Sequence, residues 1–206
     1  MIRLFASGLT AAALLTAGYA GLAQAQSSPA NVVAADVQAG TYKLETSHAR
    51  VQFAVSHFGF STWWGDFTGA TGTLKLDPKN VAASSVEVTI PADSVTTTNA
   101  KLDGELKEWF GAAEHPTITF KSTAVTQTSP TTADIVGDLT FHGVTKPVTL
   151  KARFGGAGVN PMNKAYTVGF EATGALKRSD FGVANYVPLV GDEVTLTISA
   201  PFEKQG

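Results

Sequence analysis

Apolar and polar residues alternate at several places along the chain, and turn signals separate these stretches. The alternation is clearest over residues 50–55, 86–90, 148–154 and 194–198. A period of two puts successive side chains on opposite faces of a β-strand, so each stretch predicts a strand with one apolar and one polar face. Many such strands with little helix between them must close into a barrel or pack as two sheets. The apolar face is therefore either a packed core or the lining of a cavity.

The same pattern predicts an all-β fold, with a single domain over 41–206. We expect a closed antiparallel barrel of about eight strands. The strands are predicted at about 41–46, 49–57, 64–76, 85–93, 116–126, 133–142, 145–153, 164–175 and 193–203. The glycine-rich run Gly155-Gly156-Ala157-Gly158 predicts a flexible hairpin connection.

One segment, 99–110, has a helical rather than a strand period. Leu102, Leu106, Trp109 and Phe110 share one face, and Lys101 and Glu105 are spaced as an i, i+4 ion pair on another. The segment predicts a short helix that caps one end of the barrel.

The N-terminus has the features of a secretory signal peptide. Arg3 precedes an apolar run over 4–20, and Ala23-Gln24-Ala25 supplies a small-x-small cleavage site. The alternative is a membrane anchor, but Ser, Thr and Gly residues interrupt the run. We expect a signal peptide over 1–25, export to a bacterial periplasm, and a flexible leader over 26–40.

Composition narrows the classes of function. The formal net charge is −2, which argues against nucleic acid or an anionic membrane as the main partner. The chain has no cysteine, so disulfides, thiolate metal sites and cysteine nucleophiles are excluded. The sequence has no recognisable catalytic, nucleotide-binding or zinc motif. We therefore expect no catalytic residues, no metal and no cofactor.

Several short motifs, in order along the chain, resemble the YceI-like family. They are Thr46-Ser47-His48-Ala49-Arg50-Val51-Gln52-Phe53 with Ser56-His57-Phe58-Gly59, Gly65-Asp66-Phe67, Asp93-Ser94-Val95-Thr96-Thr97, Pro116-Thr117-Ile118-Thr119-Phe120, Gly137-Asp138-Leu139-Thr140 and Arg178-Ser179-Asp180-Phe181-Gly182. The resemblance spans about 42–202. It implies a lipocalin-like barrel in the periplasm whose lumen binds a long isoprenoid chain, such as a polyprenyl phosphate or a quinone tail. The implied protein is a carrier and not an enzyme, with transient membrane contact and an open oligomeric state.

Three candidate positions carry alternatives. His57 falls on the apolar face of its strand and would either hydrogen-bond a ligand head or be a satisfied core histidine. Trp63 and Trp64, in a predicted loop, would form either a lid over the lumen or ordinary packing. Arg178 would pair either with Asp180 or with a ligand phosphate. His115 and His142 are predicted to face solvent.

The residues expected to contact the ligand come from inward strand positions, the helix and the aromatic loops. They are Phe53, Val55, His57, Phe60, Trp63, Trp64, Phe67, Leu102, Leu106, Phe110, Phe120, Phe141, Phe170, Arg178 and Phe181. Two other functions compete with a carrier. One is a lipid-acting enzyme with His57 as base, and the other is a stress-response or structural barrel filled by its own side chains.

Overall fold

The structure is a computed structural model that describes residues 28–206. The predicted signal peptide, 1–25, lies outside the described residues. The strands are β1 (Gly40–Leu44), β2 (Arg50–His57), β3 (Ser61–Phe67), β4 (Thr71–Leu76), β5 (Ser85–Pro91), β6 (Val95–Thr96), β7 (Thr117–Ser129), β8 (Thr132–Phe141), β9 (Val144–Val159), β10 (Tyr166–Lys177) and β11 (Val190–Lys204). The helix α1 spans Ala100–Trp109, and short 3₁₀ turns are η1 (Ala34–Asp36), η2 (Val81–Ala83), η3 (Ala92–Ser94) and η4 (Arg178–Phe181).

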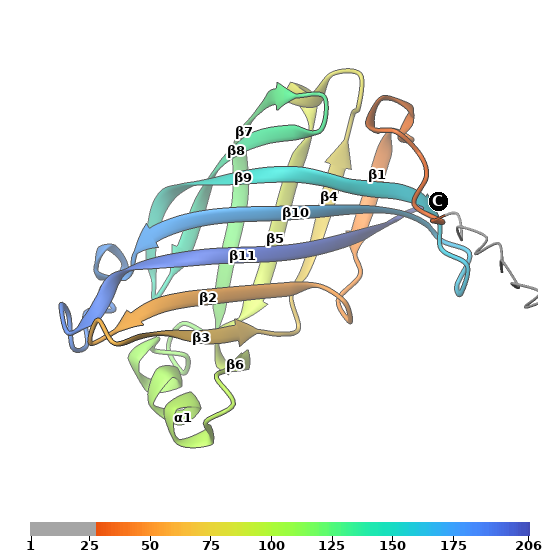
Figure 1. Cartoon of the computed structure of the whole chain (residues 1–206). Coiled ribbons are helices and arrows are strands. Elements are labelled where there is room, and N and C mark those ends of the chain that lie inside the picture. Colours follow the sequence, from red (N-terminus) through yellow and green to blue (C-terminus); the bar gives the residue numbers. More distant parts are fainter. Residues whose placement is uncertain (1–27) are drawn as a thin grey trace, which may run out of the picture.

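Eight of these strands close into an antiparallel barrel, which confirms the predicted fold (Figure 1). The ring runs β1-β4-β5-β7-β8-β9-β10-β11 and returns to β1. One edge of β11 pairs with two strands. Near its C-terminal end, Phe202 pairs with Leu44 of β1, and earlier in the strand Ser199 pairs with Arg50 of β2. The wall therefore splits beside β11, and β2 continues into β3 and the short β6.

Helix α1 lies at the end of the barrel beside β3 (Figure 1), as the sequence predicts. Asn99 caps it by accepting hydrogen bonds from the backbone N–H groups of Lys101 and Leu102 (3.2 and 3.3 Å), which would otherwise lack partners. Asp103 accepts from the backbone N–H and the hydroxyl of Thr97, both at 2.7 Å, and so ties the helix to β6.

Two strand predictions are wrong in detail. The single strand expected over 64–76 is two strands, because the chain turns at Thr68–Ala70, where Gly69 has a φ of 69°. Trp63 and Trp64 pair with Val55 and Ala54 of β2, so they belong to strand β3 and not to a loop. The glycine-rich run is not a hairpin connection either, since it lies within β9.

The segment 28–40, which the sequence predicts as part of a leader, contacts the barrel at Val32 and Val37. Val32 donates its backbone N–H to the carbonyl of Ala157 on β9 (3.0 Å), and Val37 is buried in the core. The glycines of β9 permit this approach: a Cβ at Gly158 would lie 2.0 Å from the carbonyl oxygen of Pro29. The glycine-rich run therefore lets the backbone of the leader pack directly against β9.

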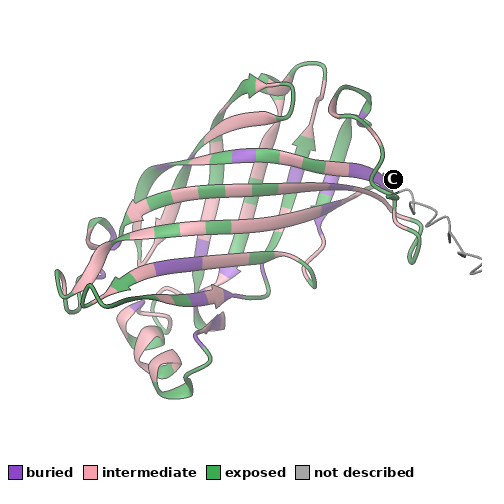
Figure 2. Cartoon of the chain, viewed as in Figure 1, coloured by how far each residue is buried: buried purple, intermediate pink, exposed green. Residues whose placement is uncertain are grey.

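Burial follows the alternation of the strands. Exposed positions alternate with buried and half-buried ones along β9, β10 and β11 (Figure 2). The inward face of the sheet is therefore apolar, and the outward face is exposed to solvent. Within residues 28–206, no helix has the length and hydropathy needed to cross a membrane.

Candidate functional site

The barrel encloses an apolar cavity of about 310 Å³. Its lining comes from every strand of the ring except β1, together with β2, β3 and α1. Among the lining residues, only Ser84, Ser85 and Arg178 are neither aliphatic nor aromatic. A cavity of this size and chemistry is at the lower end of the range for small-molecule sites and suits an apolar chain.

Aromatic rings form a continuous series along one side of the cavity. The ring centroids of Phe53 and Phe67 are 5.6 Å apart, those of Phe67 and Phe110 5.9 Å, and those of Phe110 and Phe141 5.1 Å. The series continues to Phe181 on η4, 6.0 Å from Phe141. These spacings favour edge-to-face and tilted contacts. The series joins β2, β3, the C-cap of α1, β8 and η4 along this side of the cavity.

Arg178 does not pair with Asp180; the backbone of its own loop supplies its partners. Its side chain is buried, and it donates to the carbonyl oxygens of Gly191 (2.8 Å), Val183 (3.0 Å), Asn185 (2.8 Å) and Val190 (2.9 Å). These bonds use four of its five N–H groups. Burial lowers the pKa of the guanidinium, and nearby Asp192 acts in the opposite direction. Arg178 therefore holds the loop before β11 in shape, and the predicted ion pair with Asp180 is wrong.

His57 and Trp63 lie next to each other near the turn that joins β2 to β3. The two rings are 5.8 Å apart, and His57 also stacks edge-on with Phe58 at 4.5 Å. The Nε1–H of Trp63 is buried and has no hydrogen-bond partner among the residues that the structure describes. A buried donor without an acceptor is unfavourable, so this N–H is a candidate for a contact with a ligand.

The structure brings nine of the fifteen predicted contact residues to the cavity. They are Phe53, Val55, Phe67, Leu106, Phe110, Phe120, Phe141, Phe170 and Arg178. The other six do not line it: His57, Trp63 and Leu102 are half-buried beside it, Phe60 and Trp64 are exposed, and Phe181 is buried behind Phe141. Contact of any of these residues with a ligand stays a prediction.

Most residues that line the cavity are not among the fifteen predicted contact residues. The lining also includes Leu74 of β4, Val88 of β5, Leu150 of β9, and Val194, Leu196 and Ile198 of β11. The alternation places all of these on apolar faces, so the signal was available. Aliphatic residues carry no other mark that distinguishes a cavity wall from a solid core.

His115 and His142 are not solvent-facing as predicted. Both are half-buried, and their rings pack edge-to-face with centroids 5.6 Å apart. The Nδ1–H of His142 donates to the carbonyl of Phe181 (2.9 Å). The pair thus ties the turn after α1 to the β8–β9 turn and to η4.

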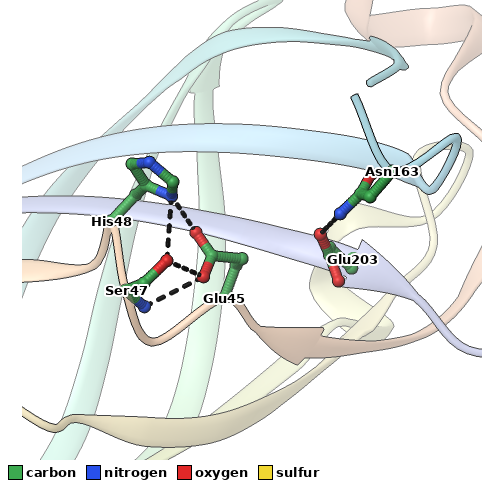
Figure 3. A network of polar contacts seen from close by, with 5 residues as sticks. All are labelled: Glu45, Ser47, His48, Asn163 and Glu203. Atoms are coloured by element: carbon green, nitrogen blue, oxygen red, sulfur yellow. Dashed lines mark hydrogen bonds and ion pairs between the residues drawn. The ribbon is translucent and has the colours of Figure 1, made fainter. Parts of the chain in front are cut away.

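A carboxylate, a hydroxyl and an imidazole meet at the turn between β1 and β2 (Figure 3). Glu45 accepts from the backbone N–H of Ser47 (2.9 Å) and from its hydroxyl, and Glu45 also contacts Nδ1 of His48. The hydrogen bond from Ser47 is the main reason that the pKa of Glu45 falls to about 2. The same Nδ1 faces both other groups, so the imidazole does not relay a proton between them. None of the three lines the cavity, and the cluster fixes the turn.

No group of three or more side chains able to hold a metal ion occurs within 28–206. The closed barrel, its capping helix and its apolar cavity define a lipocalin-like antiparallel β-barrel. The profile of the YceI-like domain family matches residues 42–202. The chain is also 40% identical to the protein YceI of Escherichia coli O157:H7 over 182 residues, 86% of this chain and 92% of that protein. This protein therefore belongs to the YceI-like family.

Two solved structures share the fold. One is BcnA of Burkholderia cenocepacia, with a TM-score of 0.70 and 22% identity over 77% of this chain and 98% of that one. The other is described as a polyisoprenoid binding domain from Saccharophagus degradans. It has a TM-score of 0.59 and 12% identity over 82% of this chain and 100% of that one.

Proposed function

We propose that this protein binds an isoprenoid chain in the lumen of the barrel and carries it through the periplasm. The observation that carries the proposal is the apolar cavity of about 310 Å³. The polyisoprenoid binding domain from Saccharophagus degradans, which shares the fold, supports the choice of ligand class.

Apolar burial is sufficient for such binding. Each buried methylene contributes about 0.8 kcal/mol, so one five-carbon unit contributes up to a few kcal/mol. Three enclosed units therefore contribute up to about 12 kcal/mol, and against an association cost at the low end of the range, about 4 kcal/mol, they leave roughly 8 kcal/mol, which corresponds to micromolar affinity. Arg178 is occupied by the chain's own carbonyls. A charged or quinone head group therefore remains near the opening, and the isoprenoid tail fills the lumen.

The cavity bears on the competing functions. An unfilled lumen disfavours a barrel whose core is closed by its own side chains. His57 stands beside the cavity and not in its lining, which gives no support to a lumenal base. The periplasmic location rests on the signal-peptide features of 1–25. Sequencing the N-terminus of the exported protein tests it: we expect a start at or near Gln26, and retention of Met1 in a membrane fraction would contradict it.

Mass spectrometry of organic extracts from protein purified from its native periplasm tests the ligand. We expect an isoprenoid in extracts of the wild type. Ala172 of β10 lines the cavity, so Ala172→Phe should fill the space and remove the ligand without unfolding the barrel.

Ala175 of the same strand is exposed, which makes Ala175→Phe a matched control that should keep the ligand. Wild-type extracts without isoprenoid, or equal isoprenoid in the two variants, would contradict the proposal.

A further inference from the structure

Exposed aromatic and aliphatic side chains gather at one end of the barrel. Two segments form this surface: residues 58–64, which are the β2–β3 turn and the start of β3, and residues 182–190, which end at the first residue of β11. Together we call them the aromatic tip. They carry Phe58, Phe60, Trp64, Tyr186 and Leu189, all of which are exposed. The β2–β3 hairpin and the loop before β11 lie at the same end of the molecule in Figure 1, and Figure 2 shows their tips as exposed.

The two segments are held together as one surface. The backbone N–H of Phe58 donates to the carbonyl of Leu189 (2.8 Å), and Val190 pairs with His57. The ring of Tyr186 lies 5.6 Å from the ring of Trp109 on α1. The tip is therefore a fixed part of the fold.

Two of the exposed aromatic residues, Phe58 and Tyr186, have strained backbone conformations. Phe58 has a φ of 52° and Tyr186 a φ of 60°. Positive φ is unfavourable for bulky side chains, and such strain is concentrated at functional sites. Phe60, two residues after Phe58, is 91% exposed. An aromatic ring held in water is unfavourable unless a partner covers it.

The charge of the tip points to the kind of partner. Neither 58–64 nor 182–190 contains an acidic or basic residue, which excludes recognition of nucleic acid or of a charged protein surface. Trp and Tyr with Phe and Leu, without charge, is the composition that favours the interfacial region of a lipid bilayer. A bilayer also accepts protruding side chains without needing a pocket of matching shape.

The tip is continuous with the cavity. Leu189 is exposed, and the next residue, Val190, lines the cavity. On the hairpin side, Val55 of β2 lines the cavity two residues before His57. A bilayer in contact with the tip would therefore meet the lumen at the base of these two loops.

We propose that the aromatic tip inserts into the surface of a lipid bilayer and seats the barrel so that an apolar chain passes between the bilayer and the lumen. The proposal rests on the proposed function for its purpose, but its contacts are those of the tip alone. Because the tip is uncharged, insertion requires no anionic lipid and is insensitive to salt.

Vesicle binding tests the proposal. Wild-type protein is sedimented with phosphatidylcholine vesicles at low and at high salt, and its tryptophan fluorescence is followed with brominated phosphatidylcholine. We expect co-sedimentation at both salt concentrations and quenching, since Trp64 is in the tip. Phe60→Asp and Leu189→Asp should each lower the vesicle partition about tenfold or more, since each change replaces an inserted apolar side chain with a charge.

Met162→Asp is the matched control. Met162 is 88% exposed in the β9–β10 loop, at the other end of the barrel in Figure 1, and its replacement should leave partition unchanged. All three positions are exposed, so the variants should fold, and circular dichroism checks this. Equal partition of the tip variants and Met162→Asp, or no binding by the wild type, would overturn the proposal. Self-association of the wild type that Phe60→Asp abolishes, without vesicle binding, would identify a second copy as the occupant and also overturn it.

The content of bound ligand separates this proposal from the proposed function. Tip variants that retain isoprenoid after loading in detergent, but no longer bind vesicles, support membrane docking. A wild type that binds vesicles through the tip, but carries no isoprenoid, would contradict the carrier function and leave the docking surface standing.

Discussion

The ring of Phe53 on β2 occupies the space beside Gly65 on β3 that a side chain at position 65 would need. The two residues are direct cross-strand partners, and a Cβ at Gly65 would lie 2.2 Å from Cζ of the ring. A similar arrangement recurs across the barrel, where a Cβ at Gly137 of β8 would lie 2.4 Å from Cζ of Phe120. In each case a glycine lets a phenyl ring lie flat against the wall, and both rings line the cavity.

Gly65→Ala should therefore destabilise the protein. The new methyl group must displace the Phe53 ring, and overpacking of this kind lowers the free energy of unfolding by about 1–3 kcal/mol. Urea unfolding followed by circular dichroism measures the change. Gly104→Ala is the control, since nothing lies within 4 Å of a Cβ at this helical position. It should raise stability by about 0.5–1 kcal/mol. Equal midpoints for Gly65→Ala and wild type would contradict the role of the close contact.

Arg178→Lys should lower stability and leave ligand binding by the folded protein unchanged. A lysine has three donors without the planar fork, so carbonyls now bonded to Arg178 would lose partners in a buried site. We expect a loss of about 2–4 kcal/mol in thermal or urea unfolding. Arg153→Lys, at an exposed position of β9, should change stability little. A stable Arg178→Lys protein that loses ligand would instead make Arg178 an anchor for the ligand.

Trp63→Phe should leave the free energy of unfolding unchanged or raise it by up to about 1 kcal/mol, because it removes a buried donor that has no partner. Chemical denaturation of the ligand-free protein is the measurement, with Trp64→Phe on the outer face of β3 as the comparison. A loss of ligand affinity with intact stability would identify the Nε1–H as a donor to the bound molecule. A clear loss of stability in the ligand-free variant would mean that the lost packing of the indole outweighs the removal of the unpaired donor.

Acid should weaken the β1–β2 turn through Glu45. Its folded pKa, about 2, lies below its ordinary value of 4.5, mainly because Ser47 donates to the ionised form. The stabilisation is therefore complete above pH 4.5 and is lost as the pH falls towards 2. The side chain is 23% exposed, so solvent screening keeps the contribution on the order of 1 kcal/mol.

Glu45→Gln tests this dependence. Its deficit against the wild type in urea unfolding should be largest near pH 7 and should shrink between pH 4.5 and 2. Glu108→Gln, at an exposed position of α1, should show no such trend. A constant deficit for Glu45→Gln across this range would mean that ionisation of Glu45 does not stabilise the turn.

The sequence by itself determined the class of fold, the helix and part of the cavity wall. Alternation with a period of two depends only on neighbouring positions, so Phe53 and Val55 could be placed on an inward face before any pairing was known. The Asn99 cap and the spacing of Lys101 and Glu105 are likewise local to α1. The ordered motifs identified the family for the same reason, since they can be compared without a structure.

Only the tertiary structure decided what polar and glycine-rich segments do. Arg178 could have met a carboxylate or a ligand, and the fold of the loop before β11 presents it with four carbonyls. Gly158 belongs to a predicted hairpin connection, but in the fold it lies within β9, and Pro29 of the leader packs against it. Trp63 and Trp64 are expected in a loop, and their pairing with β2 places them in strand β3. In each case the same residue satisfies its hydrogen bonds or packing in several ways, and only contacts with other segments of the chain select among them.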